Sequence, residues 1–233
     1  MAGPSSSAPD GSEAGPGQGR LTFRPAPPGR MTGGTGMMSV QGTAEAAPAR
    51  AYVPGTSDGR DPLRLVVLLH GAGGRAERSV NWLRPFADAG RLLLLAPTST
   101  QATWDGIHER YGPDVLNLDR LLHRVTADYP VNAYTVAGFS DGASYSLSIG
   151  LANGDVFDSV VAFSPGFSAA QLRVGRPRFF VSHGTEDPVL PIEQTSRRIV
   201  PALRSSGYDV TYREFDGGHE LSAGILQSAA DWL

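Results

Sequence analysis

Six apolar runs of strand length recur along the chain between residues 63 and 215. They occupy residues 63–69, 91–96, 133–137, 159–163, 178–181 and 210–215. The first five are largely apolar, with apolar residues at consecutive positions, whereas the last alternates more between apolar and polar residues. Runs that are apolar on both faces are typical of strands in a parallel sheet that helices cover on both sides.

Segments with helical spacing of apolar residues lie between these runs. In residues 114–129, for example, Val115, Leu118 and Leu122 recur at spacings of three and four, and Pro130 ends the pattern. Similar segments are expected at residues 76–89, 143–152, 191–206 and 221–233. Because strands alternate with helices, the pattern predicts an α/β fold with a mostly parallel, doubly wound sheet.

The first 60 residues follow a different pattern. Residues 1–20 contain five Gly, three Pro and four Ser and no aromatic residue. Such a segment buries too little apolar surface to offset the entropy lost on ordering, which predicts a disordered tail over residues 1–20 and a single domain over residues 21–233. Within residues 21–60, two short edge strands are expected at residues 21–23 and 49–53.

Composition excludes several kinds of chemistry. The 233 residues include no cysteine, and all 20 basic residues are arginine. Disulfides, thiolate metal sites, a cysteine nucleophile and lysine Schiff bases are therefore excluded. The net charge is −3 and the arginines are scattered, so no nucleic-acid partner is expected. Uninterrupted apolar runs reach five residues, far short of the roughly 20 of a membrane span, and we expect a cytoplasmic protein without such a span.

A nucleophile motif stands between a predicted strand and a predicted helix. Residues 138–142 (GFSDG) match G-x-S-x-G, with the strand at 133–137 before them and the helix at 143–152 after them. This strand–turn–helix context is the one in which such a serine serves as a nucleophile, which makes Ser140 the candidate. The alternative is a glycine-rich turn in which Ser140 caps the helix.

The chain also supplies a base and an acid in the order that this motif requires, Ser, acid, His. Of the five histidines, His219 follows the last predicted strand, directly after Gly217 and Gly218. Glu186 and Asp187 are both candidates for the acid. Asp187 is favoured because the following proline holds its backbone extended, and His183 is expected to be structural.

Stabilising the oxyanion of an acyl-transfer reaction needs two backbone donors. The N–H of Asp141, directly after the nucleophile, is one candidate. The N–H of Ala72 is the other, because it lies in the glycine-rich segment 70–74 (HGAGG) after the first core strand. Glycines permit the close approach of backbone to substrate that this role demands, although an ordinary strand-to-helix turn would have the same composition.

These residues together resemble the α/β-hydrolase superfamily. The resemblance rests on LLHGAGG at 68–74, GFSDG at 138–142, HGTEDPVLP at 183–191 and GGHE at 217–220, and it covers about residues 50–233. Within the superfamily the chain looks like the small bacterial serine esterases of the carboxylesterase/phospholipase-like branch. It is similar also to polyhydroxybutyrate-depolymerase-like and feruloyl-esterase-like hydrolases, although secreted depolymerases usually carry cysteines and an export signal. Asp141 departs from the Gln, Asn or His that often follows the nucleophile.

The resemblance implies a serine carboxylesterase with an α/β-hydrolase fold and a small-molecule ester substrate. Ser140 would attack the ester carbonyl, His219 would transfer the proton, and Asp187 would orient His219, with no metal or organic cofactor. An acyltransferase or thioesterase would use the same residues, and a non-catalytic hydrolase-fold binding protein is the alternative from another class. A monomer or homodimer is expected.

Substrate access is predicted to be open. Only 14 residues separate Phe163 from Arg178, too few for a helical cap, which favours short-chain or bulky esters. Trp104 lies in the long segment 97–113 and is a candidate wall of the acyl pocket, with surface packing as the alternative. Val189 matches a position that lines the acyl pocket in similar thioesterases, again with simple packing as the alternative.

Overall fold

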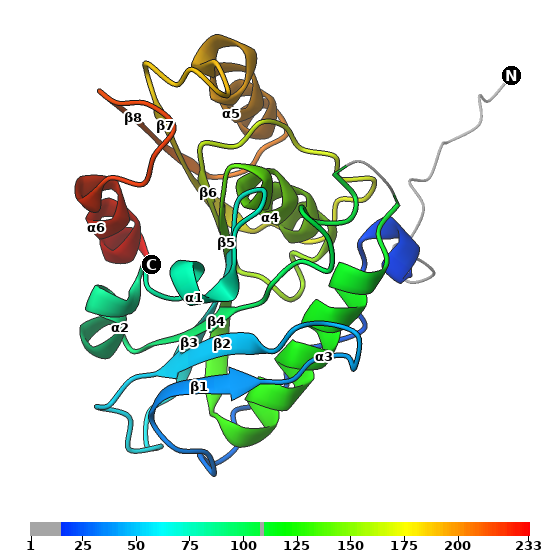
Figure 1. The fold of residues 1–233 in the computed structure, drawn as a ribbon, viewed down its shortest axis with the longest axis vertical. Helices are drawn as coiled ribbons and strands as arrows, with labels where there is room; N and C mark the ends of the chain where they lie inside the picture. The colour runs from blue at the N-terminus through cyan, green and yellow to red at the C-terminus, as the bar shows by residue number, and fades with distance from the viewer. Residues whose placement is uncertain (1–14, 108–109) are drawn as a thin grey trace, which may run out of the picture.

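An eight-stranded sheet forms the centre of the molecule in the computed structural model, which describes residues 15–107 and 110–233 (Figure 1). Its strands are β1 (Gly36–Val40), β2 (Ala49–Val53), β3 (Leu63–Leu69), β4 (Leu92–Ala96), β5 (Val131–Phe139), β6 (Ser159–Phe163), β7 (Arg178–Gly184) and β8 (Val210–Phe215). They follow the order β1-β2-β4-β3-β5-β6-β7-β8. The six strands from β3 to β8 pair in parallel, and β1 and β2 extend one edge in antiparallel pairings.

Helices cover both faces of the sheet. The helices are α1 (Ala76–Ser79), α2 (Arg84–Gly90), α3 (Pro113–Asp128), α4 (Asp141–Ala152), α5 (Ser196–Ser205) and α6 (Ala223–Trp232), with 3₁₀ turns η2 (Pro16–Gln18) and η3 (Ile192–Gln194). Helices α3, α4 and α5 lie on one face, and α1, α2 and α6 lie on the other (Figure 1). The predicted α/β class, with a mostly parallel doubly wound sheet, is confirmed.

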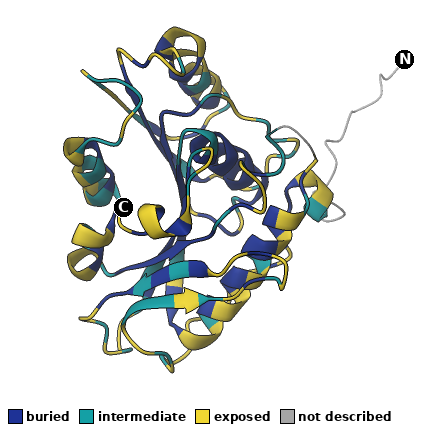
Figure 2. Cartoon of the chain, viewed as in Figure 1, coloured by how far each residue is buried: buried dark blue, intermediate teal, exposed yellow. Residues whose placement is uncertain are grey.

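Strand β3 shows why the central strands are apolar at consecutive positions. Leu65 and Val67 pack in the cluster that contains α3 and α4, whereas Val66 and Leu68 pack in the cluster that contains α1, α2 and α6. All four side chains are fully buried. Figure 2 shows the same burial along the middle of the sheet and along α4. Because both faces need apolar side chains, the two-residue period of the strand disappears from the sequence.

The segment expected to be one helix over residues 76–89 is instead two helices, α1 and α2. Pro85 lies in the first turn of α2, where its missing N–H costs nothing. In a continuous helix the same ring would clash with the carbonyl of Asn81, so the chain turns at residues 80–83 and begins a new helix.

The expected strand at residues 21–23 is wrong, although its apolar side chains are buried as that prediction implies. The N–H of Leu21 donates to Asn153 Oδ1, and the N–H of Phe23 donates to Asp119 Oδ1. Side chains of two helices therefore satisfy this backbone, and no strand partner is needed. The edge strand on this side of the sheet is β1, which begins at Gly36.

The body of the molecule begins before residue 21. Residues 1–14 of the expected tail lie outside the described residues, and of residues 15–20 the last two, Gly19 and Arg20, are buried. Arg20 is 5% exposed, and its guanidinium donates to both carboxylate oxygens of Asp155 at 2.6 Å. It also donates to Asn153 Oδ1 at 3.0 Å. Among the described helices, none is long and apolar enough to cross a membrane.

Candidate active site

Ser140 occupies the sharp turn between β5 and α4. Its backbone has φ 58° and ψ −119°, a conformation that residues other than glycine rarely adopt. The two flanking glycines make this turn possible. A Cβ on Gly138 would lie 2.1 Å from the carbonyl oxygen of Gly142, and a Cβ on Gly142 would lie 2.1 Å from the carbonyl oxygen of Leu69. The spacing in G-x-S-x-G therefore follows from steric exclusion on both sides of the serine.

The side chain of Ser140 forms a hydrogen bond with His219 and does not cap α4. Ser140 Oγ lies 2.8 Å from His219 Nε2, and no side-chain bond from Ser140 caps the helix. On the other side of the ring, His219 Nδ1 lies 2.6 Å from Asp187 Oδ2. One imidazole thus connects a strained serine with a buried carboxylate, which is the arrangement that activates a serine hydroxyl.

The carboxylate of Asp187 is buried and fully hydrogen-bonded. Its Oδ1 accepts the N–H groups of Val189 at 2.9 Å and Leu190 at 2.8 Å. Burial alone would raise the pKa of Asp187, but the hydrogen bonds from Leu190, His219 and Val189 outweigh burial and hold that pKa below its ordinary value. Glu186, the alternative acid, is exposed. The geometry therefore favours Asp187 as the partner of His219.

His183 is fully buried beside this carboxylate. Its Nε2 lies 2.8 Å from the carbonyl oxygen of Leu190 and 3.2 Å from Asp187 Oδ2, and its Nδ1 lies 2.7 Å from Ser196 Oγ. Burial lowers the pKa of His183, so the ring is neutral at neutral pH. With one proton on Nε2, His183 donates to Leu190 and accepts from Ser196. It thereby fixes the loop that carries Asp187.

The two expected oxyanion donors belong to Asp141, directly after Ser140, and to Ala72, directly after Gly71. Gly71 is the close-approach residue, because a Cβ on it would lie 3.2 Å from Ser140 Cβ. Next to it, Ala72 lies in an exposed loop. Within residues 15–107 and 110–233, the N–H groups of Ala72 and Asp141 donate to no protein acceptor. Both donors are therefore available to a substrate oxygen.

Buried His70 holds the loop of Ala72 in place. His70 Nε2 accepts the N–H of Ser99 at 3.0 Å, so Nδ1 carries the proton and donates to the carbonyl oxygen of Gly71 at 2.7 Å. Burial lowers the pKa of His70, which keeps this tautomer neutral. The indole N–H of Trp104 donates to the carbonyl oxygen of His70 at 2.8 Å.

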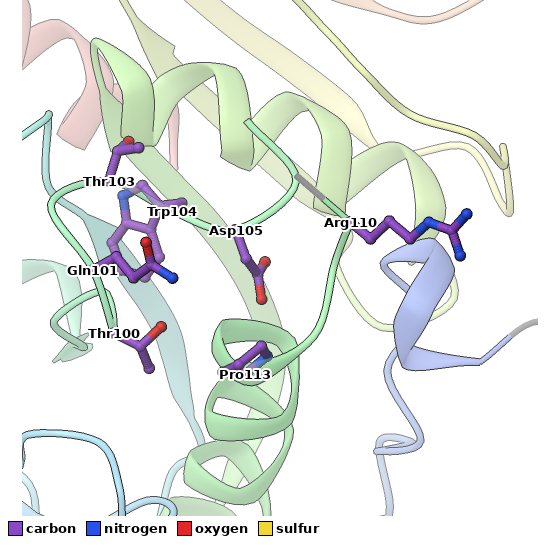
Figure 3. Close-up of a pocket in the computed structure, with 7 residues that line it drawn as sticks. All are labelled: Thr100, Gln101, Thr103, Trp104, Asp105, Arg110 and Pro113. Atoms are coloured by element: carbon purple, nitrogen blue, oxygen red, sulfur yellow. The ribbon is translucent and has the colours of Figure 1, made fainter. Parts of the chain in front are cut away.

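Trp104 lines a cavity that is separate from the one at His219. It is 3% exposed and stacks on Tyr145, with ring centroids 5.4 Å apart. The cavity that it lines measures about 240 Å³, and its lining does not include Ser140 or His219 (Figure 3). The structure therefore places Trp104 against the His70 loop, and its role as a wall of the acyl pocket stays a prediction.

Val189 is the second residue expected to line the acyl pocket. Its side chain is 62% exposed and does not line the cavity at His219. Its backbone N–H, however, donates to Asp187. Val189 therefore contributes to the site through its backbone. A sequence pattern that concerns side chains lining a pocket does not predict such a backbone hydrogen bond.

Two carboxylates that the sequence analysis missed, Asp114 and Asp105, hold residues 100–105 in place and connect them to α4. Asp114 accepts the N–H groups of Thr100 and Asp105, both at 2.8 Å, and burial raises its pKa. Asp105 in turn accepts the hydroxyl of Tyr145 at 2.6 Å. Thr103, in the same segment, donates its hydroxyl to Asp141 Oδ2 at 2.7 Å. The unusual aspartate after the nucleophile thus fastens this segment to α4.

A second cavity, of about 280 Å³, borders His219. It is lined in part by the oxyanion loop through Gly71 and Ala72, and by Phe139 directly before the nucleophile. Among the described residues, no group of three His, Asp or Glu side chains is placed to hold a metal ion.

Comparisons with known proteins agree with this fold. The family model described as "Putative esterase" matches residues 84–201, about half of the chain, and includes Ser140 and Asp187. The chain belongs to this esterase family and is a carboxylic ester hydrolase with an α/β-hydrolase fold. The resemblance drawn from the sequence motifs is confirmed. No curated protein sequence matches the chain.

Solved structures with the same fold are distant in sequence. Esterase PE8 is 22% identical, covers 84% of this chain and 98% of its own, and has a TM-score of 0.64. The S-formylglutathione hydrolase FrmB from Staphylococcus aureus is 13% identical, covers 86% of this chain and 99% of its own, and has a TM-score of 0.67. The carboxylesterase of Bacillus cereus is 19% identical, covers 79% and 92%, and has a TM-score of 0.60. At such identities these structures establish the fold.

Proposed function

We propose that this esterase hydrolyses its substrates through Ser140, His219 and Asp187 with an acyl-enzyme intermediate. The observation that carries the proposal is the position of His219. One ring nitrogen lies 2.8 Å from Ser140 Oγ and the other lies 2.6 Å from Asp187 Oδ2. The serine hydroxyl, the base and the orienting acid are thus in hydrogen-bond contact before any substrate binds.

In the first half of the reaction, Ser140 Oγ attacks the ester carbonyl carbon while His219 Nε2 takes the hydroxyl proton. The carbon–oxygen bond to the alcohol then breaks, and His219 returns this proton to the leaving oxygen. In the second half, water attacks the acyl-enzyme by the same route, releasing the acid and restoring Ser140. Asp187, ionised at neutral pH, keeps the proton of neutral His219 on Nδ1 and stabilises the imidazolium that forms.

The N–H groups of Ala72 and Asp141 would bind the oxygen that becomes negative in the tetrahedral intermediate. Removing one such donor typically costs about 2.7–4 kcal/mol of transition-state stabilisation. The first turn of α4 adds the positive end of its dipole at the same place. Gly71 supports this role, because its lack of a side chain lets the loop reach Ser140.

We propose short-chain or bulky esters as substrates. Residues 164–177, which connect β6 and β7, contain no helix that could cover the nucleophile. Each CH₂ group contributes about 0.8 kcal/mol only where protein covers it. Acyl chains of about two to six carbons are therefore expected to react faster than chains of ten or more.

Labelling with a fluorophosphonate probe tests the assignment of the nucleophile. We expect the probe to modify wild-type protein at Ser140, located by peptide mass spectrometry, and to leave the Ser140→Ala variant unmodified. Ser205→Ala is the matched control, because Ser205 is exposed on α5, and this variant should label like wild type. Labelling at another serine, or persistence of labelling in Ser140→Ala, would overturn the proposal.

A further inference from the structure

The cavity at His219 lies beside the nucleophile, between the loop of Gly71 and the loop of His219. Gly71 belongs to its lining and approaches Ser140 so closely that a Cβ on Gly71 would lie 3.2 Å from Ser140 Cβ. His219, Glu220 and Leu221 form another part of the lining. A group attached to the reacting carbon of a substrate on the His219 side would therefore extend into this cavity.

The inner wall of this cavity is aromatic. The ring of Phe139 lies against the ring of His219, with centroids 4.7 Å apart and an interplanar angle of 36°. Trp82 meets Phe139 edge to face, with centroids 6.3 Å apart. Leu221 adds an aliphatic surface. A flat apolar group of a substrate would find both area to bury and ring edges to contact on this wall.

The rim of the cavity carries two arginines, Arg75 and Arg78. Both are exposed, and among the described residues neither guanidinium forms an ion pair. The one acidic residue in the lining is Glu220. Its Oε1 turns back toward Gly217, at 2.8 Å from the position that a Gly217 Cβ would take. The rim thus presents two unpaired guanidiniums, the group best suited to a planar carboxylate.

The chemistry of the proposed function decides which part of a substrate enters. His219 Nε2 must return the proton to the leaving oxygen, so the leaving alcohol lies on the His219 side of the reacting carbon. The carbonyl oxygen lies toward the N–H groups of Ala72 and Asp141. We propose that this cavity binds the alcohol portion of the ester, and that the preferred alcohol is an aromatic hydroxyl compound carrying a carboxylate. This inference rests on the proposed function.

Two acetate esters with closely related alcohols test the proposal. The substrates are 4-acetoxybenzoate, whose leaving group carries a carboxylate, and its neutral methyl ester. Each kcat/KM is divided by the rate constant for imidazole-catalysed hydrolysis of the same ester, which removes the difference in intrinsic reactivity. We expect wild type to prefer the anionic ester about three- to tenfold, a range set by two exposed charges, and the preference to shrink in 0.5 M NaCl.

Replacing the two rim arginines should remove this preference. In the double variant Arg75→Gln/Arg78→Gln the normalised ratio should fall to about one. Arg120→Gln is the control, because Arg120 is exposed on α3 on the opposite face of the sheet, and this variant should keep the wild-type ratio. For the aromatic wall, Trp82→Ala should lower kcat/KM for the neutral aryl ester at least about fivefold more than for ethyl acetate.

The outcomes separate this inference from the proposed function. If Ser140 is required for hydrolysis of both esters but wild type shows no preference for the anion, the inference is wrong and the triad stands. The same holds if the preference survives in the double arginine variant, or if Trp82→Ala affects aryl and alkyl esters equally. If Ser140→Ala retains hydrolysis of either ester, the proposed function fails and this inference fails with it.

Discussion

At Ser140 the strained backbone and the side chain together place the hydroxyl beside His219. The positive φ of 58° directs the hydroxyl away from the helix that follows, and Oγ lies 2.8 Å from His219 Nε2 instead. Asp187 accepts hydrogen bonds from the other ring nitrogen, Nδ1, and from two backbone N–H groups. The loop of Asp187 is fixed in turn by neutral His183, so the acid has little freedom to turn away from His219.

Substitutions at Asp187 and Glu186 test which carboxylate orients His219. Asp187→Asn is expected to lower kcat by about 10⁴-fold, because an amide can present an N–H to Nδ1 and stabilise the wrong tautomer of His219. Glu186→Gln removes an exposed carboxylate of the same loop and should change kcat less than about threefold. Steady-state rates on p-nitrophenyl acetate measure both. Greater damage from Glu186→Gln would make Glu186 the acid.

Among the structural elements, the segment at residues 15–23 joins the body through side chains rather than through a strand. Arg20 inserts its guanidinium beside the end of α4, where it meets Asp155, Asn153 and the carbonyl oxygen of Ala152. Burial alone would raise the pKa of Asp155, but the hydrogen bond and the charge of Arg20 outweigh burial and hold that pKa below its ordinary value. The contact therefore stabilises the folded state wherever Asp155 is ionised.

Arg20→Ala is expected to lower the free energy of unfolding by about 2 kcal/mol at pH 7. Breaking a fully buried pair costs about 3–5 kcal/mol, and the Asp155 side chain here is 32% exposed, which reduces that cost. The ion pair contributes fully above the unfolded pKa of about 3.9 and is lost as the pH falls through the lower folded pKa. Urea unfolding should therefore show a smaller deficit near pH 3. The exposed Arg30→Ala is the control, and a deficit as large in that variant would contradict the account.

Over the whole molecule, two fully enclosed histidines make stability depend on pH. His70 and His183 lie under the two loops that flank Ser140, and burial lowers the pKa of each. The unfolded chain takes up protons on these residues below a pKa of about 6.5, whereas the folded chain resists protonation until a lower pH. Since the unfolded state then binds more protons at these two residues, their contribution lowers stability as the pH decreases below about 6.5.

The free energy of unfolding is accordingly expected to fall by roughly 1–2 kcal/mol between pH 7.5 and pH 5.5. In His183→Gln the fall should be about half as large, because one of the two buried titrating groups is gone. His123→Gln, whose wild-type side chain is 58% exposed, should keep the wild-type fall. Urea unfolding at the two pH values measures the difference. If the free energy of unfolding of His183→Gln falls as much as that of wild type, His183 does not contribute to the pH dependence.

Much of the fold, and the contact among Ser140, His219 and Asp187, could be predicted from the sequence, and particular residues show why. The central strands could be predicted because both of their faces are buried, which makes them apolar at consecutive positions. Ser140 could be predicted because only glycines fit two positions before and two positions after it. Pro188 distinguishes Asp187 from Glu186. Arg20 and Asp114 were missed because their roles depend on partners that are far away in the chain or in a neighbouring loop, and a single polar residue carries no local sign of such partners. The sequence left two roles open for Trp104 for the same reason, because its contacts with His70 and Tyr145 are not local either.

The central claim is that Ser140 carries the acyl group during turnover. Wild-type protein mixed with p-nitrophenyl acetate and quenched in acid within the first turnovers should gain the mass of one acetyl group, and peptide mapping should locate it on Ser140. The reaction should release a burst of p-nitrophenol stoichiometric with enzyme if deacylation is slower than acylation. The account predicts that Ser140→Ala shows neither the acetyl group nor the burst. Acetylation at another residue, or hydrolysis by Ser140→Ala within tenfold of wild type, would contradict it.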